Sequence, residues 1–245
     1  MNNLRLRGPV HGLLLNGSEG RESSLPFWGL MFFTFVLFVT PQSYFPVLHS
    51  VSLGKLSAGL AFVVYVLSRL ARGKSLTVVT PAVRLVLCVV LLALLSIPFS
   101  RWPGGSMTVF VEELSKSLIV FLLISNAVNT VQRMRLMIGS MALWGIIMSW
   151  VAVRDYSEGN LAPGGLRIFG YDSPLAANPN DLALTVNLIL ALVIGLYLGA
   201  RKGPARLLIV AAIGILASAV ITSFSRGGFL SLVTILLVVL IQRVR

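Results

Sequence analysis

Two short segments of this chain carry side chains that could bind an anionic phosphate group. The first contains Arg167 and, further along, the sequence Asn178-Pro179-Asn180-Asp181. This sequence is typical of a turn that ends in a helix N-cap, and the N–H groups at such a helix end suit an anion. In the second, Arg226 is followed by two glycines, which allow a backbone or a ligand to approach closely. Two guanidiniums on one side of the molecule could hold a pyrophosphate bidentately.

Each segment also has a purely structural interpretation. Asn178 and Asn180 could simply cap a helix, and for Asn-Pro-Asn taken alone this is the better interpretation. Arg226 lies between two otherwise uncharged runs, so its side chain could extend to the lipid headgroups without any further role. The presence of Arg167 as a second guanidinium and of the glycines favours a binding site.

A third polar group consists of Glu112, Glu113 and Lys116. Residues three and four apart share a helix face, so an internal ion pair is the modest interpretation, and Lys116 stays open as a residue that lines a substrate groove. The sequence contains no Walker loop, no His-Glu-x-x-His and no Gly-x-Ser-x-Gly, and it has one cysteine. His11 and His49 have no metal-ligand spacing. We therefore assign no metal site and no catalytic residue from the motifs.

The composition indicates which solvent surrounds these segments. Hydrophobic residues make up 56% of the 245 residues, charged residues make up only 11%, and the mean hydropathy is +0.90. A soluble domain carries roughly a quarter charged residues, so the polar surface here is too small to cover the molecule. Lipid must cover the rest, and the expected fold class is all-α, a polytopic transmembrane helical bundle.

Apolar runs of suitable length recur along the chain. A helix needs about 20 mostly apolar residues to cross ~30 Å of hydrocarbon. Eight spans are expected, at residues 25–41, 51–68, 82–98, 107–127, 136–153, 181–199, 206–223 and 228–242. Residues 1–24 then form a cytoplasmic tail, and residues 25–245 form one transmembrane domain.

The net charge of +12 is distributed unevenly between the two sides of these spans. Most Lys and Arg residues fall in the tail, in the second, fourth and sixth connections and at the C-terminus. Positively charged segments stay in the cytoplasm, so both ends of the chain are expected inside. The main polar loop, residues 154–180, and Arg226 are then on the outer face. Since the basic residues are dispersed and not interleaved with aromatic residues, nucleic acid is not an expected partner.

The two polar segments together resemble a known family. The order Arg167-Ile168-Phe169-Gly170, then Asn178-Pro179-Asn180-Asp181-Leu182-Ala183 opening a span, then Thr-x-x-Ser-Arg-Gly-Gly over residues 222–228, is similar to the bacterial O-antigen ligase and polymerase superfamily. The hydropathy layout agrees from Leu25 to Arg245, whereas the motifs cover only residues 167–183 and 222–228.

This resemblance implies a membrane enzyme of polysaccharide synthesis in the bacterial inner membrane. Such an enzyme transfers a glycan from an undecaprenyl pyrophosphate carrier to an acceptor saccharide or glycolipid on the outer face, without a metal or nucleotide cofactor. Arg167 and Arg226 would bind the pyrophosphate, and Arg154 would replace Arg167 if the alignment is shifted. Asn178, Asn180 and Lys116 are supporting candidates.

The chain departs from the family pattern at its end. Family members have ten to twelve or more spans, and the proposed catalytic histidine lies in a late outer loop, whereas eight spans are expected here. The sequence is thus expected to be the N-terminal portion of such an enzyme or a divergent branch. The alternatives are a transporter or channel, disfavoured because no internal repeat is visible, and a non-catalytic membrane scaffold.

Overall fold

The computed structural model describes residues 24–48, 52–162, 167–200 and 203–244. Of the sequence-based expectations, the cytoplasmic tail at residues 1–24, with His11, lies outside the described residues except for Ser24. His49 also lies outside them. Over the described residues the chain is all-helical, and the one contact of β type is an isolated bridge between Leu161 and Ile168.

The helices follow one another with short connections. They are α1 (Leu25–Val39), α2 (Leu53–Leu70), α3 (Pro81–Ser96), α4 (Pro103–Val109), α5 (Ser115–Ala127), α6 (Val131–Ser157), α7 (Pro179–Gly199), α8 (Pro204–Thr222) and α9 (Arg226–Val244). A π-helical turn, η4 (Phe110–Leu114), joins α4 and α5. Three short 3-10 turns, η1 (Pro41–Ser43), η2 (Pro46–Leu48) and η3 (Ile97–Phe99), follow α1 and α3.

The apolar helices bear out the coarse prediction of a polytopic membrane protein. Among the described residues, α2, α3 with η3, α6, α7 and α8 are long and apolar enough to cross a bilayer, and α1 and residues 226–242 are shorter apolar helices. The helix formed by α4, η4 and α5 contains the third polar group, which is Glu112, Glu113 and Lys116. A number of eight membrane crossings and cytoplasmic placement of both ends stay predictions.

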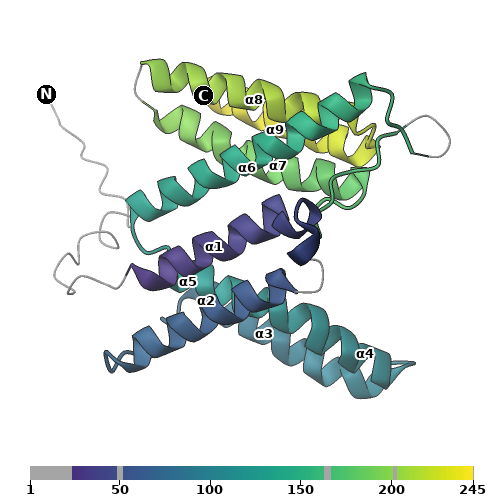
Figure 1. Ribbon diagram of the computed structural model, residues 1–245. Coiled ribbons are helices and arrows are strands. Elements are labelled where there is room, and N and C mark those ends of the chain that lie inside the picture. Colours follow the sequence, from purple (N-terminus) through teal and green to yellow (C-terminus); the bar gives the residue numbers. More distant parts are fainter. Residues whose placement is uncertain (1–23, 49–51, 163–166, 201–202, 245) are drawn as a thin grey trace, which may run out of the picture.

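Successive helices run in opposite directions, so the connections alternate between two ends of the molecule (Figure 1). The connections that follow α1, α3, α6 and α8 lie at one end (Figure 1), which we call the loop end; their described residues are 40–48, 52, 97–102, 158–162, 167–178 and 223–225. Residues 71–80, 128–130 and 200–203 connect helices at the opposite end. α6, α7, α8 and α9 form one group, and α1, α2 and α5 form the other, with α1 packed against α6 (Figure 1).

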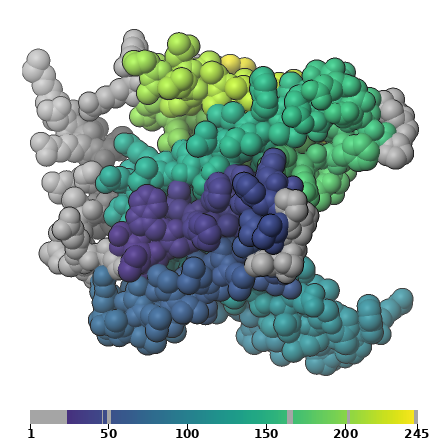
Figure 2. Space-filling view, in the orientation of Figure 1, coloured from purple at the N-terminus to yellow at the C-terminus, as the bar shows by residue number. Residues whose placement is uncertain are grey.

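The buried side chains form one cluster in each group. Leu182, Ile189 and Leu216 are among the fully buried residues of the α6–α9 cluster, and Leu30 and Leu123 are fully buried in the other. Most of the remaining apolar side chains are exposed, as expected where lipid is the solvent. α3 is the extreme case, since Val83 is its only buried residue. α3 and α4 project from the body of the molecule (Figure 2).

Several helices extend beyond the spans expected from hydropathy. α6 continues through Ser157, so the first four residues of the expected 154–180 loop are helical. α7 begins at Pro179 rather than at residue 181, and α9 begins at Arg226 rather than at residue 228. A span that is placed by hydropathy stops where polar residues begin. A helix can continue through such residues, because proline suits its first turn and asparagine caps it. The differences therefore lie at the polar helix ends.

Candidate anion site at the loop end

Arg167 joins the main polar loop to two other segments. Its Nη2 donates a hydrogen bond to Oδ1 of Asn180 at 2.7 Å, and its Nε donates to the backbone oxygen of Ser223 at 3.4 Å. Asn180 lies in the first turn of α7, and Ser223 follows the last residue of α8. The Arg167 side chain is half-buried between them. The guanidinium is thus held in place by acceptor oxygens on two of its edges.

Asn178 caps α7, as its sequence context predicts. Its Oδ1 accepts hydrogen bonds from the backbone N–H groups of Asn180 and Asp181, both at 3.0 Å. Its Nδ2 donates to Oδ2 of Asp181 at 2.6 Å. Two of the N–H groups that an anion could use are therefore occupied by the cap, and the Asp181 carboxylate already complements the positive helix end. Asn178 positions α7, while Asn180 is the residue that contacts Arg167.

The start of α9 lies directly against α7. Ser225 caps α9, because its Oγ accepts a hydrogen bond from the backbone N–H of Gly228 at 3.1 Å. The backbone oxygen of Gly228 accepts one from Nδ2 of the buried Asn187 of α7, at 2.9 Å. A Cβ atom built on Gly228 would lie 2.5 Å from Cβ of Ala183, which leaves no room for a side chain. This close approach brings the N-termini of α7 and α9 together at the loop end.

Arg226 is the first residue of α9 and is exposed. Within the described ranges it makes no hydrogen bond and no ion pair. Arg167 contacts the turn that leads into α9, at Ser223, so both guanidiniums belong to the same end of the α7–α9 pair. Of the two guanidiniums, that of Arg167 is therefore fixed by contacts and that of Arg226 is exposed.

Two other candidate residues have acidic partners of their own. Arg154 is in the last turn of α6. Its Nη2 lies 3.3 Å from Oδ1 of Asp155, and its Nε lies 3.8 Å from Oε2 of Glu158. Nζ of Lys116 lies 3.9 Å from Oε1 of Glu113, and this is the ion pair that helical spacing predicts. Lys116 belongs to α5, in the helix group that does not contain α7 and α9 (Figure 1). No contact of the described residues joins Arg154 or Lys116 to Arg167.

Sequence reasoning missed the contacts that hold the polar loop in place. Ser173 Oγ donates to the backbone oxygen of Leu37 at 2.8 Å, and the Tyr171 hydroxyl donates to that of Val39 at 3.3 Å. The Thr40 hydroxyl donates to the backbone oxygen of Asp172. These residues are more than 130 positions apart, and no local pattern predicts such a pairing. The loop is therefore attached to the end of α1 by a set of contacts that we call the loop strap.

Two further features shape the strap. The Tyr171 and Tyr44 hydroxyls lie 3.3 Å apart. Burial, reinforced by the Tyr44 hydroxyl, raises the pKa of Tyr171 well above its ordinary value, so this phenol stays neutral at physiological pH. Gly170 has a φ of +106°, and a Cβ there would lie 2.7 Å from the Ala176 oxygen. Glycine adopts this backbone conformation without strain, and a larger residue here would clash with the Ala176 oxygen.

Comparison with protein-family models, with curated proteins and with solved structures found no match to this chain. The resemblance to O-antigen ligases and polymerases therefore depends on the residues of the two motifs. What the fold adds is their position: both motifs lie at the loop end, in direct contact.

Proposed function

We propose that this chain is a membrane glycosyltransferase of the O-antigen ligase or polymerase type, or the N-terminal portion of one. It acts in the bacterial inner membrane on a glycan carried by undecaprenyl pyrophosphate, and its product belongs to the cell envelope or an exopolysaccharide. One observation supports this most. The two segments that resemble the family meet through the hydrogen bond from Arg167 to Ser223, across 56 positions of sequence.

The chemistry of the carrier fits this contact. When a glycan leaves undecaprenyl pyrophosphate, negative charge develops on the pyrophosphate. Fixed hydrogen-bond donors stabilise such charge without reorganising during the reaction. Arg167 is held by Asn180 and Ser223, so its guanidinium is pre-positioned. Arg226 is exposed at the first turn of α9 and can close on the second phosphate, where the positive helix end adds to the attraction.

The proposal is tested by carrier binding to the purified full chain in nanodiscs of phosphatidylcholine. The affinity for undecaprenyl pyrophosphate is measured for the unaltered chain, for Arg226→Gln and for Arg101→Gln. Arg101 is exposed at the same end but outside the site, which makes it a control of equal charge. A charge-assisted hydrogen bond contributes about 1.5–3 kcal/mol, so Arg226→Gln is expected to weaken binding roughly tenfold to a hundredfold.

The control variant is expected to bind as the unaltered chain does. Equal affinities for Arg226→Gln and the unaltered chain would remove Arg226 from the site. Absence of carrier binding in all three proteins would contradict the proposed function itself.

A further inference from the structure

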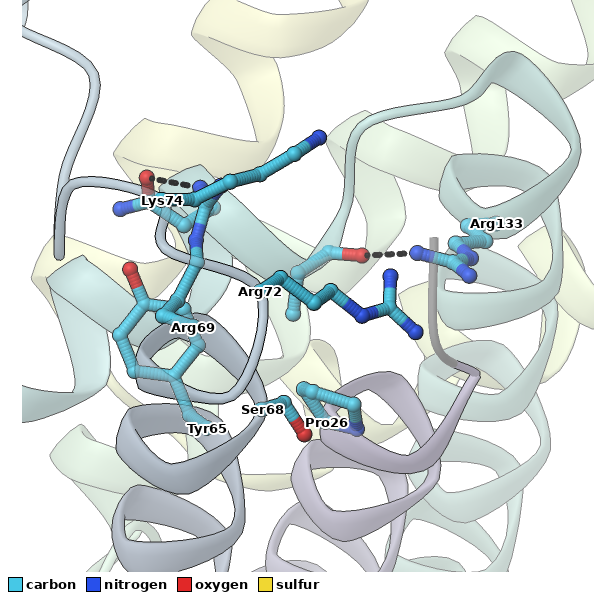
Figure 3. A pocket seen from close by; sticks show the side chains of 9 residues that line it. Pro26, Tyr65, Ser68, Arg69, Arg72, Lys74 and Arg133 are labelled. Atoms are coloured by element: carbon cyan, nitrogen blue, oxygen red, sulfur yellow. Dashed lines mark hydrogen bonds between the residues drawn. The ribbon is translucent and has the colours of Figure 1, made fainter. Parts of the chain in front are cut away.

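The basic residues at the opposite end of the molecule are used within the chain. In Figure 3, Nη1 of Arg133 donates a hydrogen bond to the backbone oxygen of Ala127, at 3.2 Å. The other basic residues shown there also have partners within the chain; they are Arg69, Arg72 and Lys74. Such interactions account for this cluster, and we assign it no ligand. The side chains whose placement needs another explanation lie at the loop end.

Phe224, in the turn between α8 and α9, has a backbone conformation that glycine usually supplies after a helix. Its φ is +49°, in the left-handed region, where a Cβ atom crowds the following carbonyl oxygen. The serines on either side of it are buried, and the N–H of Ser225 donates to Oγ of Ser223 at 3.2 Å. Phe224 itself is 52% exposed. The turn therefore keeps a strained residue whose ring adds little to the core.

Tyr156, in the last turn of α6, lies against Phe224. The two ring centroids are 5.6 Å apart, and the ring planes make an angle of 43°. Tyr156 is 44% exposed, so neither ring is buried by the other. A glycine in place of Phe224 would end α8 without strain, and a weak contact between two exposed rings does not explain why a phenylalanine is there. We call these two residues the aromatic pair.

Polar side chains that can bind hydroxyl groups accompany Tyr156. Asp155, Glu158 and Asn160 lie within four residues of it, and Nδ2 of Asn160 donates to Oε2 of Glu158 at 3.2 Å. Carboxylate and amide oxygens accept hydrogen bonds from hydroxyl groups. The C–H groups on the face of a pyranose ring are slightly positive and are attracted to the negative face of an aromatic ring. A sugar thus fits both kinds of surface, whereas an acyl chain fits only the rings.

We propose that the aromatic pair binds the pyranose ring that is linked to the pyrophosphate of the carrier. This inference rests on the function proposed above. Phe224 directly follows Ser223, which accepts the hydrogen bond from Arg167, and it precedes Arg226 by two residues. A sugar on these rings is therefore next to a pyrophosphate held by the two arginines, as the covalent structure of the donor requires. Backbone strain of the kind seen at Phe224 is concentrated at ligand sites.

Two carriers separate the sugar contact from the pyrophosphate contact. The full chain in phosphatidylcholine nanodiscs is titrated with undecaprenyl pyrophosphate and with the same carrier bearing one N-acetylglucosamine. We expect the unaltered chain to bind the sugar-bearing carrier roughly fivefold more tightly than the bare carrier. Phe224→Leu and Tyr156→Leu keep an apolar side chain but lose a ring, so they are expected to lose this preference and to bind the bare carrier as before.

Phe99→Leu is the matched control, because Phe99 is an exposed phenylalanine of the loop end that lies outside the aromatic pair. It is expected to keep the preference for the sugar-bearing carrier. Phe224→Gly removes the ring and the strain together. Its melting temperature is expected to equal or exceed that of the unaltered chain, while the preference is lost.

The outcomes separate this inference from the proposed function. Equal affinity of the unaltered chain for the two carriers would overturn the sugar site and leave the proposed function intact. Equal weakening of both carriers in the leucine variants of the pair would mean that the rings only anchor the protein at the membrane interface, and would overturn it as well. If neither carrier binds to the unaltered chain, the proposed function fails and the sugar site fails with it.

Discussion

At the scale of single residues, the two arginines of the loop end have different environments. Arg167 is half-buried between Asn180 and Ser223, whereas Arg226 is exposed. A variant of Arg167 therefore loses tertiary contacts as well as a charge, and a variant of Arg226 loses only the charge. Binding measurements on Arg167 variants have to be read together with their stability.

This difference predicts how Arg167→Lys behaves. A lysine keeps the charge, but one ammonium group cannot span the Asn180 and Ser223 oxygens as a planar guanidinium does. We expect Arg167→Lys to lower the free energy of unfolding by about 1–2 kcal/mol, and Arg226→Lys to leave it unchanged. Denaturation in detergent measures both. Equal stability of the two variants would mean that the Arg167 contacts contribute nothing to the fold.

Tyr171 predicts a pH dependence of the loop strap. Its folded-state pKa is raised, and the unfolded phenol ionises near pH 10. Its contribution is therefore fully present below about pH 10, and it is lost as the pH rises further, because the unfolded state then releases its proton first. We expect the melting temperature to fall above pH 10, and to fall less in Tyr171→Phe. The same slope in both proteins would show that Tyr171 does not cause the effect.

At the scale of the elements, the contact between α7 and α9 determines whether the two motifs meet. Gly228 faces Ala183 with no space for a Cβ atom, whereas nothing lies within 4 Å of a Cβ built on Gly227. We expect Gly228→Ala to destabilise the fold by roughly 1–3 kcal/mol through overpacking, and to weaken carrier binding by moving the helix ends apart. Gly227→Ala is the matched control, with stability equal to or slightly above that of the unaltered chain. Thermal melting that is the same for both would contradict the packing argument.

At the scale of the whole molecule, the charge distribution predicts that the loop end is on the outer face. This is tested by labelling single cysteines with a membrane-impermeant maleimide in cells, in a Cys88→Ala background. Ser157→Cys, at the loop end, is expected to react in intact cells, and Ser75→Cys, at the opposite end, only after permeabilisation. Both serines are exposed. The reverse pattern would place the anion site in the cytoplasm and would contradict the proposed function.

Sequence alone predicted the helical character, the apolar segments and the polar residues between them. These are local properties, because a run of apolar residues in lipid has to satisfy its own backbone hydrogen bonds. The cap at Asn178 and the ion pair of Lys116 with Glu113 are local as well, and both were predictable from spacing. The boundaries were less accurate, since the first turn of α7 and the last turn of α6 are polar.

Only the tertiary structure decided which polar residues meet. The sequence offered Arg167 as a ligand, Arg154 as its replacement and Lys116 as a supporting residue, and Arg167 alone among these three contacts both motifs. Its partners depend on how closely α7 and α9 pack at Gly228, and the strap depends on where α1 ends beside a loop more than 130 positions away. Such contacts are set by the packing of whole helices, whereas sequence patterns report on neighbours within a few turns.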